Sequence, residues 1–429
     1  MINEIRLKNF KSFADGALRV GPFTVMVGTN ASGKSNMRDA FRFLHGIGRG
    51  YTLAEIIGGK YGSGGQVEWG ALRGSAREIV RFGKEKFSLE VTFSYTSTSR
   101  YTYHITVMED QNVRSGFRVI KELLAPSYSD WLGECIYTSH PGVGDPINNQ
   151  EDEKKLLLRM SKTGDQRRLG ARLEARSDQP ALTQIADSKR ISRYQRDRIE
   201  FAVQLFSSMR FLDLVPDAMR KPAFPGQTVL GDSGENLSTV LQDICSDSTK
   251  KGTIIEWIRE LTPMDIKDLA FVPDGITGLV QLAIVEYSGQ IVSSYSVSDG
   301  TLRFLAMLAA LFGSKPAMVY FFEEIDNGIH PSRLRVLLDM IETQTKKRGT
   351  QVITTTHSPD LLSMISDETF ENTSVVARAS GGAFSIIKPV KTLPKAIELR
   401  KDQGLGRLHA SGWMEDIVSF TIEHNQEER

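Results

Sequence analysis

A glycine-rich stretch near the amino end of the chain carries the residue types that bind polyphosphate. Residues 28–35 are Gly-Thr-Asn-Ala-Ser-Gly-Lys-Ser, which fits the pattern G-x-x-x-x-G-K-[ST]. Small residues let a loop wrap its backbone N–H groups around phosphate oxygens, and a following helix adds the positive end of its dipole. Lys34 supplies a mobile charge for the β- and γ-phosphates, and the Ser35 hydroxyl is a ligand for Mg²⁺. The stretch therefore predicts a site for a nucleoside triphosphate and Mg²⁺.

Two adjacent carboxylates, Glu323 and Glu324, follow the apolar run 316–322. Transfer of a phosphoryl group to water needs a metal ion whose waters one carboxylate positions, and a second carboxylate beside the attacking water. We expect Glu323 to serve the metal and Glu324 to act as the base or orienting group. Adjacent acids at a strand end are also common on protein surfaces, so the catalytic interpretation depends on the phosphate loop.

Two further segments contain residues suited to the same chemistry. His357 follows the apolar run 351–356, and an imidazole at the end of a strand parallel to the loop strand could reach the γ-phosphate or the attacking water. Residues 298–300, Ser-Asp-Gly, precede a helix with one apolar face, and such a helix N-terminus binds anions. Each segment has a structural alternative. His357 could be a packed histidine, and residues 298–300 could be a simple helix cap. Their order around the acidic pair favours function.

The elements that must position these residues alternate between strands and helices. Apolar alternation predicts strands at the amino end and at 23–27, and helical spacing predicts a helix over 37–45, which argues against a plain glycine-rich turn between them. Residues 76–108 hold runs typical of antiparallel strands with one wet face. From residue 236 onward we expect helix, helix, two strands, helix, strand, helix, strand, helix. The sequence thus predicts an α/β fold with an antiparallel β lobe.

The stretch 142–220 is polar and basic. Between residues 153 and 176, eight Lys or Arg residues stand against three acids, a local net charge of +5. We expect a mostly helical insertion here, and no long coiled coil, because no heptad pattern persists. A solvated helical face and a surface for nucleic acid or a partner both remain open.

The composition is that of an ordinary globular protein. The chain of 429 residues predicts about two to three domains. Its net charge of +1 provides no overall attraction to nucleic acid or to an anionic membrane. Cys135 and Cys245 form no metal-binding pattern, and no apolar stretch is long enough to span a membrane. We expect a soluble, cytoplasmic protein without membrane contact.

Taken in order, the motifs resemble those of the ABC-type ATPases of the SMC, Rad50 and RecF group, most closely the small RecF-like and OLD-like "AAA family ATPase" proteins. The matching segments are the opening strand 7–13, the Walker A loop 28–36, the signature 297–300, the Walker B segment 321–324, the D-loop 324–331 and the switch 356–359. The resemblance covers residues 1 to about 45 and 230–390. OLD-like nucleases continue into a TOPRIM domain, but only 72 residues follow His357 and they hold no such acidic cluster.

The resemblance implies roles for individual residues. Glu324, His357 and Lys34 would be catalytic, and Ser35 and Glu323 would hold Mg²⁺. The residues implied to bind ATP are Lys11, Gly28, Thr29, Asn30, Ala31, Ser32, Gly33, Lys34, Ser35, Asn36, Ser298, Asp299 and Gly300. Three departures stand out: Ala31 replaces the commonest glycine, the signature is Val-Ser-Asp-Gly, and Glu323 stands where aspartate is commonest, which could slow turnover. No Q-loop glutamine is identified.

The resemblance also implies an architecture and partners. We expect an ABC-type ATPase head with a mixed or parallel core sheet, divided into a Walker A lobe with a β subdomain (1–140), a helical basic insertion (141–230) and a second ATPase lobe (231–429). Two chains would pair head to tail around ATP, as a homodimer or a higher homo-oligomer. Such proteins commonly serve antiviral defence or DNA repair with a separate, nuclease-like effector, and DNA or RNA could bind the insertion.

Two other functions are alternatives to an ATPase that pairs around ATP and acts with an effector. A nucleotide-dependent scaffold would hold an effector inactive with little turnover, and slow hydrolysis by the pure protein would favour it. A transporter ATPase subunit is disfavoured by the opening strand, the large insertion and the missing Q-loop.

The basic stretch provides a direct test. Charge reversal of Arg167, Arg168 and Arg172 should weaken binding of DNA or of a partner without changing ATP affinity, because this is the strongest positive cluster in a near-neutral chain. DNA binding across a salt series measures the effect. An unchanged affinity and salt slope, with partner binding retained, would show that the cluster is only a solvated surface.

Overall fold

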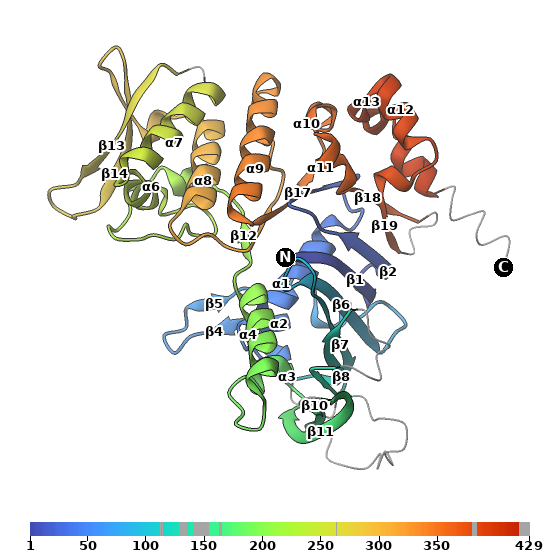
Figure 1. The fold of residues 1–429 in the computed structure, drawn as a ribbon. Coiled ribbons are helices and arrows are strands. Elements are labelled where there is room, and N and C mark those ends of the chain that lie inside the picture. The colour runs from blue at the N-terminus through green and yellow to red at the C-terminus, as the bar shows by residue number, and fades with distance from the viewer. Residues whose placement is uncertain are drawn as a thin grey trace.

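The structure, a computed structural model, shows an α/β chain built around one large sheet (Figure 1). The residues that it describes are 1–111, 113, 115–127, 135–139, 154–162, 165–262, 264–379 and 384–419. Of residues 161–169 it describes at most the backbone.

The large sheet joins an antiparallel part to a parallel part. Its strands are β1 (Ile2–Phe10), β2 (Phe13–Arg19), β3 (Phe23–Val27), β6 (Lys86–Ser94), β7 (Arg100–Glu109), β8 (Phe117–Pro126), β9 (Tyr137–Thr138), β10 (Lys155–Lys162), β11 (Asp165–Arg176), β12 (Arg210–Leu212), β16 (Val319–Phe322), β17 (Gln351–Thr356), β18 (Thr373–Arg378) and β19 (Ser385–Pro389). Within the described residues the spatial order is β11-β10-β9-β8-β7-β6-β1-β2-β19-β18-β3-β17-β16-β12. The antiparallel β lobe expected after the first helix is therefore confirmed.

Five neighbouring strands, β18, β3, β17, β16 and β12, are paired in parallel. Every residue of β3, β16 and β17 is buried, as expected for parallel strands covered on both faces. Their register pairs Thr356 with Val27 and Phe322 with Thr354, so the three strands end at the same edge of the sheet. The segments that follow these strands must therefore meet at that edge.

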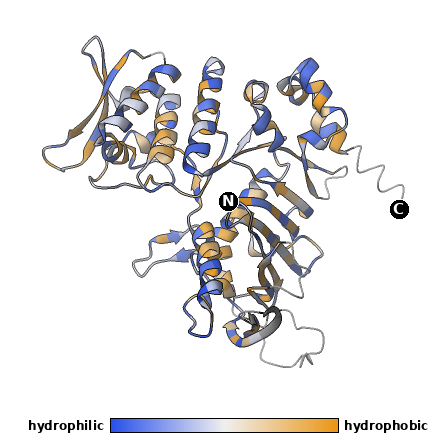
Figure 2. Cartoon of the chain, viewed as in Figure 1, coloured by the Kyte–Doolittle hydropathy of each residue, from blue (hydrophilic) through white to orange (hydrophobic). Residues whose placement is uncertain are grey.

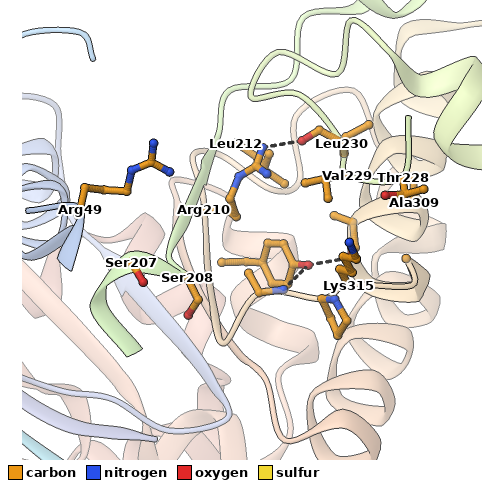
Figure 3. Close-up of a pocket in the computed structure, with 15 residues that line it drawn as sticks. Arg49, Ser207, Ser208, Arg210, Leu212, Thr228, Val229, Leu230, Ala309 and Lys315 are labelled. Carbon is orange, nitrogen blue, oxygen red and sulfur yellow. Dashed lines mark hydrogen bonds between the residues drawn. The ribbon is translucent and has the colours of Figure 1, made fainter. Parts of the chain in front are cut away.

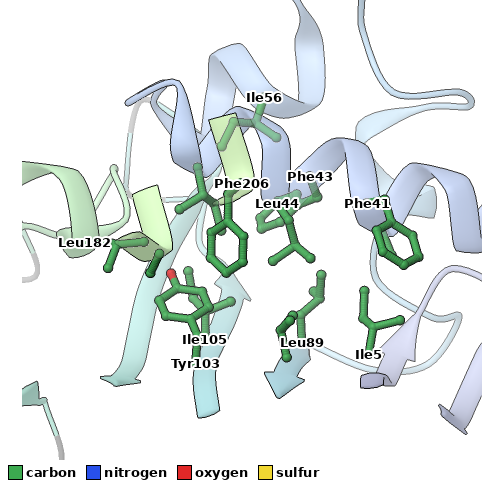
Figure 4. Close-up of a cluster of buried hydrophobic side chains, with 14 of the residues drawn as sticks. Ile5, Phe41, Phe43, Leu44, Ile56, Leu89, Tyr103, Ile105, Leu182 and Phe206 are labelled. Carbon is green, nitrogen blue, oxygen red and sulfur yellow. The ribbon is translucent and has the colours of Figure 1, made fainter. Parts of the chain in front are cut away.

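The first helix, α1 (Lys34–Gly48), covers the antiparallel lobe. In Figure 4, Phe43 and Leu44 of α1 lie above Leu89 of β6 and beside Phe206. This face of α1 is fully apolar and belongs to one continuous buried cluster with β1, β6 and β7. The other elements of this lobe are α2 (Leu53–Gly58), β4 (Lys60–Tyr61), β5 (Val67–Trp69), α3 (Ala181–Gln184) and α4 (Arg193–Ser207).

A second buried cluster holds the remaining helices (Figure 1). They are α5 (Pro216–Met219), α6 (Leu237–Cys245), α7 (Ser248–Leu261), α8 (Asp299–Phe312), α9 (Leu334–Arg348), α10 (Pro359–Met364), α11 (Asp367–Glu371), α12 (Ala396–Gln403) and α13 (Leu405–Ala410). A small antiparallel sheet of β13 (Ile266–Pro273), β14 (Val280–Glu286) and β15 (Ile291–Ser293) packs beside α6 and α7. Figure 2 shows how strongly apolar α8 is, and nearly all of its residues are buried. Among the described residues no helix is long and apolar enough to cross a membrane.

The expected element order after residue 236 is confirmed except that three strands, β13, β14 and β15, stand where two were expected. Two further expectations need correction. Strand β2 was not predicted, because its sequence, Phe-Ala-Asp-Gly-Ala-Leu-Arg, lacks a regular apolar alternation. The mostly helical insertion is wrong for residues 155–162 and 165–176, which form the antiparallel strands β10 and β11. Leu156, Leu158 and Met160 are buried at every second position, and the charges between them hid this strand period. Helices α3 and α4 agree with the rest of the prediction, and residues 140–153 lie outside the described part.

The β lobe contains a buried carboxylate whose removal tests its packing. Glu122 accepts hydrogen bonds from the hydroxyls of Tyr103 and Tyr137 at 3.0 and 2.9 Å, and from the backbone N–H groups of Ala181 and Leu182 at 2.7 and 2.9 Å. Burial raises the pKa of Glu122, and burial is the largest of the influences on that pKa. One side chain thus joins β7, β8 and β9 to the start of α3.

We expect Glu122→Ala to lower the free energy of unfolding by roughly 3 kcal/mol, because it leaves buried donors without an acceptor. Urea denaturation measures this loss. Glu85→Ala removes an exposed carboxylate from the same lobe and should change stability by under about 0.5 kcal/mol. Equal effects of the two variants would contradict the structural role of Glu122.

Candidate nucleotide site

The phosphate loop connects the end of β3 to the start of α1, as predicted. Gly28 has φ 153° and Gly33 has φ 119°, which favour glycine at both positions. A Cβ atom would lie 2.0 Å from the Val376 carbonyl oxygen at Gly28, and 2.5 Å from the Ser385 Oγ at Gly33. Ala31 has φ 61°, a left-handed conformation that strains an alanine by about 1–2 kcal/mol. The replacement of glycine by Ala31 therefore has a backbone cost that its small size does not remove.

The Lys34 side chain lies across its own loop. Its Nζ donates hydrogen bonds to the carbonyl oxygens of Gly28 at 2.5 Å and Thr29 at 2.8 Å. Burial lowers the pKa of Lys34 to about 8, against the charges of Glu324 and Glu415, which act to raise it. The Ser32 hydroxyl is buried and has no hydrogen-bond partner among the residues that the structure describes. A tight glycine cradle, a desolvated cation and an unused buried hydroxyl fit a polyphosphate group.

The parallel strands bring the acidic pair and the histidine to the same edge as this loop. Glu324 is the second residue after β16 and has φ 46°, and its backbone N–H donates to the Thr355 Oγ1 at 3.1 Å. A left-handed conformation at a residue other than glycine stores strain of the kind found at functional sites. His357 directly follows β17, and burial, with a smaller effect of Lys34, lowers its pKa. His357 is therefore neutral at pH 7 and able to accept a hydrogen bond.

Glu323 is held by two arginines that the sequence analysis did not identify. Its carboxylate lies 3.0 Å from the Arg73 guanidinium and 3.4 Å from the Nε of Arg38. Arg38 follows Lys34 by one turn of α1, whereas Arg73 comes from the segment after β5. No motif marks either residue, although a basic residue at that place on α1 is a weak signal. The metal role of Glu323 stays a prediction, and it requires at least one arginine to release the carboxylate.

The structure places Lys11 beside the first turns of α1. Its Nζ donates to the Asp39 Oδ2 at 2.5 Å and to the Arg73 carbonyl oxygen at 2.6 Å. The Lys11 and Asp39 side chains are 6% and 0% exposed, so their charges neutralise each other in a buried pair. Contact of Lys11 with a nucleotide stays a prediction, and its visible role is to fix the turn between β1 and β2 against α1.

The predicted signature lies at the start of α8. Ser298 caps this helix, because its Oγ accepts the backbone N–H of Thr301 at 3.3 Å. Arg220 pairs with Asp299 at 2.5 Å and also donates to the Val297 carbonyl oxygen, which holds the segment in place. A Cβ atom at Gly300 would lie 2.0 Å from a carbonyl oxygen of the predicted D-loop, so the two segments touch through their backbones.

The signature and the phosphate loop are not brought together within one chain. Helices α8 and α1 belong to different buried clusters and lie in different parts of Figure 1. No hydrogen bond in the described part of the chain joins residues 298–300 to residues 28–36. Completion of the site by a second chain stays a prediction.

A cavity of about 260 Å³ lies apart from all of these motifs, among Arg49, Arg210 and Lys315 (Figure 3). None of the motif residues lines it. Arg49 follows α1 and Lys315 lies just past α8, where a positive charge offsets the negative end of a helix dipole. Arg210 forms an ion pair with Asp232 at 2.8 Å. Two of these cations stabilise helix ends, and the third forms an ion pair. We therefore assign binding of the nucleotide phosphates to the sheet edge where the phosphate loop, the acidic pair and His357 meet.

Comparison with known proteins identifies the family. Residues 23–363 match the family described as "AAA domain, putative AbiEii toxin, Type IV TA system". The chain belongs to this family. The AAA family that the sequence motifs resembled is therefore confirmed, and so is the predicted α/β fold class. No curated protein matches the chain significantly.

Three of the solved structures that the chain matches are heads of SMC proteins. An SMC head bound to the C-winged helix domain of ScpA has a TM-score of 0.48 at 15% identity, over 90% of this chain and 97% of that one. The SMC head domain from Thermotoga maritima has a TM-score of 0.42 at 14% identity, over 91% and 98%. A third match is an Smc head with an extended coiled coil, bound to the C-terminal domain of ScpA derived from Pyrococcus furiosus. It has a TM-score of 0.43 at 13% identity, over 94% of this chain and 98% of that one.

Lys34→Ala should abolish ATP binding or hydrolysis and leave the fold intact, because this lysine contributes charge to the loop rather than packing to a core. Nucleotide affinity and the melting temperature are measured on the same sample. Lys84→Ala, a change at an exposed lysine far along the chain from the motifs, serves as the control. Wild-type ATP affinity in a folded Lys34→Ala protein would count against the site.

Proposed function

We propose that the protein binds MgATP at residues 28–36 and hydrolyses it with Glu324 as the residue that orients the attacking water. The observation that carries this proposal is the parallel pairing of β3, β17 and β16. It places the phosphate loop, His357 and the acidic pair at one edge of the sheet. Membership of an AAA family supports the same chemistry.

Each residue has a distinct part in the proposed reaction. Lys34 exchanges its two loop carbonyls for phosphate oxygens, which strengthens its charge interactions in a dry site. Glu324 accepts a proton from water or orients it, and neutral His357 accepts a hydrogen bond near the γ-phosphate. Ser35 and Glu323 would hold Mg²⁺, which neutralises charge on the β- and γ-phosphates when it is bound. Arg38 and Arg73 would then be released from Glu323, and their positive charges could interact with the phosphates.

We propose further that two chains pair around ATP, with the signature of one facing the loop of the other. The separation of residues 298–300 from the loop within one chain supports this arrangement. A helix N-terminus capped by Ser298 offers backbone N–H groups to an anion. Gly300 and the D-loop are in backbone contact, so a movement at one segment reaches the other.

The cellular role that we propose is control of a separate effector, nuclease-like and directed at nucleic acid, in antiviral defence or DNA repair. The description of the family names a toxin of a toxin–antitoxin system, which supports control of a harmful activity. The SMC heads with bound ScpA support docking of a partner protein on such a head. The basic strands β10 and β11 are the candidate contact for DNA or RNA.

A scaffold with little turnover is the second candidate, and one observation favours it. Glu323 is tied to both Arg38 and Arg73, and it is a glutamate where aspartate is commonest in similar ATPases. Metal binding then has to break at least one ion pair, which slows hydrolysis. Phosphate release by the pure protein separates the two candidates.

Glu324→Gln should retain nucleotide binding and lower hydrolysis by roughly 10²- to 10⁴-fold, the range expected for loss of a positioned base. Glutamine has nearly the same shape, and it meets the same left-handed backbone as glutamate. Unhydrolysed ATP should then lock the paired state. Light scattering with and without MgATP, beside phosphate release, measures both effects, and unchanged hydrolysis would exclude the catalytic role.

The double variant Glu324→Gln with Ser298→Arg is the matched control for pairing. Arginine places bulk where the γ-phosphate must approach, so the ATP-dependent oligomer should disappear. Loss of the Ser298 cap costs about 1 kcal/mol, and the melting temperature verifies that the double variant is folded. An oligomer indifferent to ATP and to Ser298→Arg would contradict the shared site.

A further inference from the structure

A second cavity, of about 420 Å³, is lined by residues of α1, β5 and β12. We call it the arginine cavity, because Arg38, Arg42, Arg49 and Arg210 all line it. It adjoins the smaller cavity of Figure 3, since Arg49 and Arg210 line both. Its volume lies within the range of small-molecule sites.

The cations that α1 contributes to this cavity are more deeply buried than the acids. The Arg38 side chain is only 9% exposed, and Arg42 is half-buried. His45 adds no charge at pH 7, because burial lowers its pKa to about 4. The acids that line the cavity are all exposed: Glu68, Asp213 and Asp232. Water and salt screen exposed charges more than buried ones, so these acids offset the two arginines only weakly.

Arg42 carries a charge that no carboxylate balances directly. Its guanidinium donates to the Gly70 carbonyl oxygen at 2.7 Å, and its Cζ lies 5.0 Å from the centre of the Trp69 ring. In the described part of the chain no ion pair joins Arg42 to an acid. Burial, and then the positive charge of Arg38, lower the pKa of Arg42. Bracing the segment after β5 is the simple alternative, but a carbonyl contact does not neutralise a half-buried cation.

Arg38 connects the arginine cavity to the acidic pair. It lines the cavity with its Cζ 5.7 Å from the centre of the Phe211 ring, and its Nε lies 3.4 Å from a carboxylate oxygen of Glu323. That Nε is buried and has no hydrogen-bond partner among the residues that the structure describes. The contact with Glu323 is longer than a good hydrogen bond, so an anion in the cavity could replace Glu323 as the partner of Arg38.

We propose that the arginine cavity binds a phosphate group through Arg42 and Arg38, and that the bound phosphate draws Arg38 away from Glu323. The planar fork of an arginine matches phosphate oxygens. A small free compound and the end of a nucleic acid strand both offer this group. The effect on Glu323 rests on the proposed function, because it requires Glu323 to hold Mg²⁺. Release of one arginine makes Glu323 easier to occupy with metal, so the phosphate activates hydrolysis.

The first test measures binding while the phosphate loop is filled. Inorganic phosphate is titrated calorimetrically into protein saturated with a non-hydrolysable MgATP analogue, which keeps the probe out of the loop. Arg42→Gln should weaken phosphate binding at least roughly tenfold, the effect of losing a charge-assisted partner. Arg19→Gln, a change at an exposed arginine of β2, should leave it unchanged. No phosphate binding by the wild type, or equal binding by the two variants, would overturn the proposal.

Arg42→Lys provides the same test if Arg42→Gln does not fold. Lysine keeps the charge and the aliphatic stem but lacks the planar fork, so phosphate binding should still weaken severalfold. Unchanged binding in folded Arg42→Lys would then overturn the proposal.

Two DNA strands of one short sequence, with and without a 5′-phosphate, distinguish the sources of the phosphate. Binding that requires both the 5′-phosphate and Arg42 supports the end of a nucleic acid strand. Binding of inorganic phosphate without binding of the phosphorylated strand supports a small free compound.

The second test measures the effect on Glu323. ADP formation is followed over a range of Mg²⁺ concentrations, with and without inorganic phosphate. The Mg²⁺ concentration for half-maximal hydrolysis should fall severalfold with phosphate in the wild type and in Arg19→Gln, but not in Arg42→Gln. An unchanged Mg²⁺ requirement in the wild type would overturn the release of Arg38. A wild type that binds neither ATP nor the analogue would overturn the proposed function, whereas phosphate binding that depends on Arg42 would still support the cavity.

Discussion

Parallel pairing of β3, β17 and β16 is the constraint on which the site depends. Parallel strands place their carboxyl ends at one edge. They are covered on both faces because the connections between them are crossovers that place helices against the sheet. The buried runs of these strands satisfy that requirement. Three chain segments that are distant in sequence thereby deliver a lysine, an acidic pair and a histidine to the same place.

Charge balance is the second feature of that edge. Lys11 pairs with Asp39, Glu323 pairs with two arginines, and the negative charge of Glu324 acts to raise the pKa of Lys34. Buried charges persist only when other charges compensate them, so an incoming polyphosphate has to exchange partners with several of these groups. Such an exchange connects nucleotide binding to elements beyond the loop, among them the segment after β5.

The local sequence pattern was sufficient to predict structure wherever the chemistry of a position is met by only one kind of residue. The glycines of the loop, the buried strand before Glu323 and the capped helix after His357 follow from spacing and turn chemistry alone. Pattern failed at β10 and β11, where a run of charges was taken for a helical face. Leu156 and Leu158 show that alternate side chains of that run are buried, a period that net charge does not reveal.

The sequence by itself determined the residue types of the motifs and most of the order of strands and helices after residue 236, because both depend on residues close together in the chain. Only the tertiary structure decided the electrostatic partners. Arg73 reaches Glu323 across 250 positions. Contacts of this kind depend on how the sheet and its helices pack, and packing brings together side chains whose separation in sequence carries no periodic signal. For that reason the residues of the loop were predictable, and the charges that oppose or release them were not.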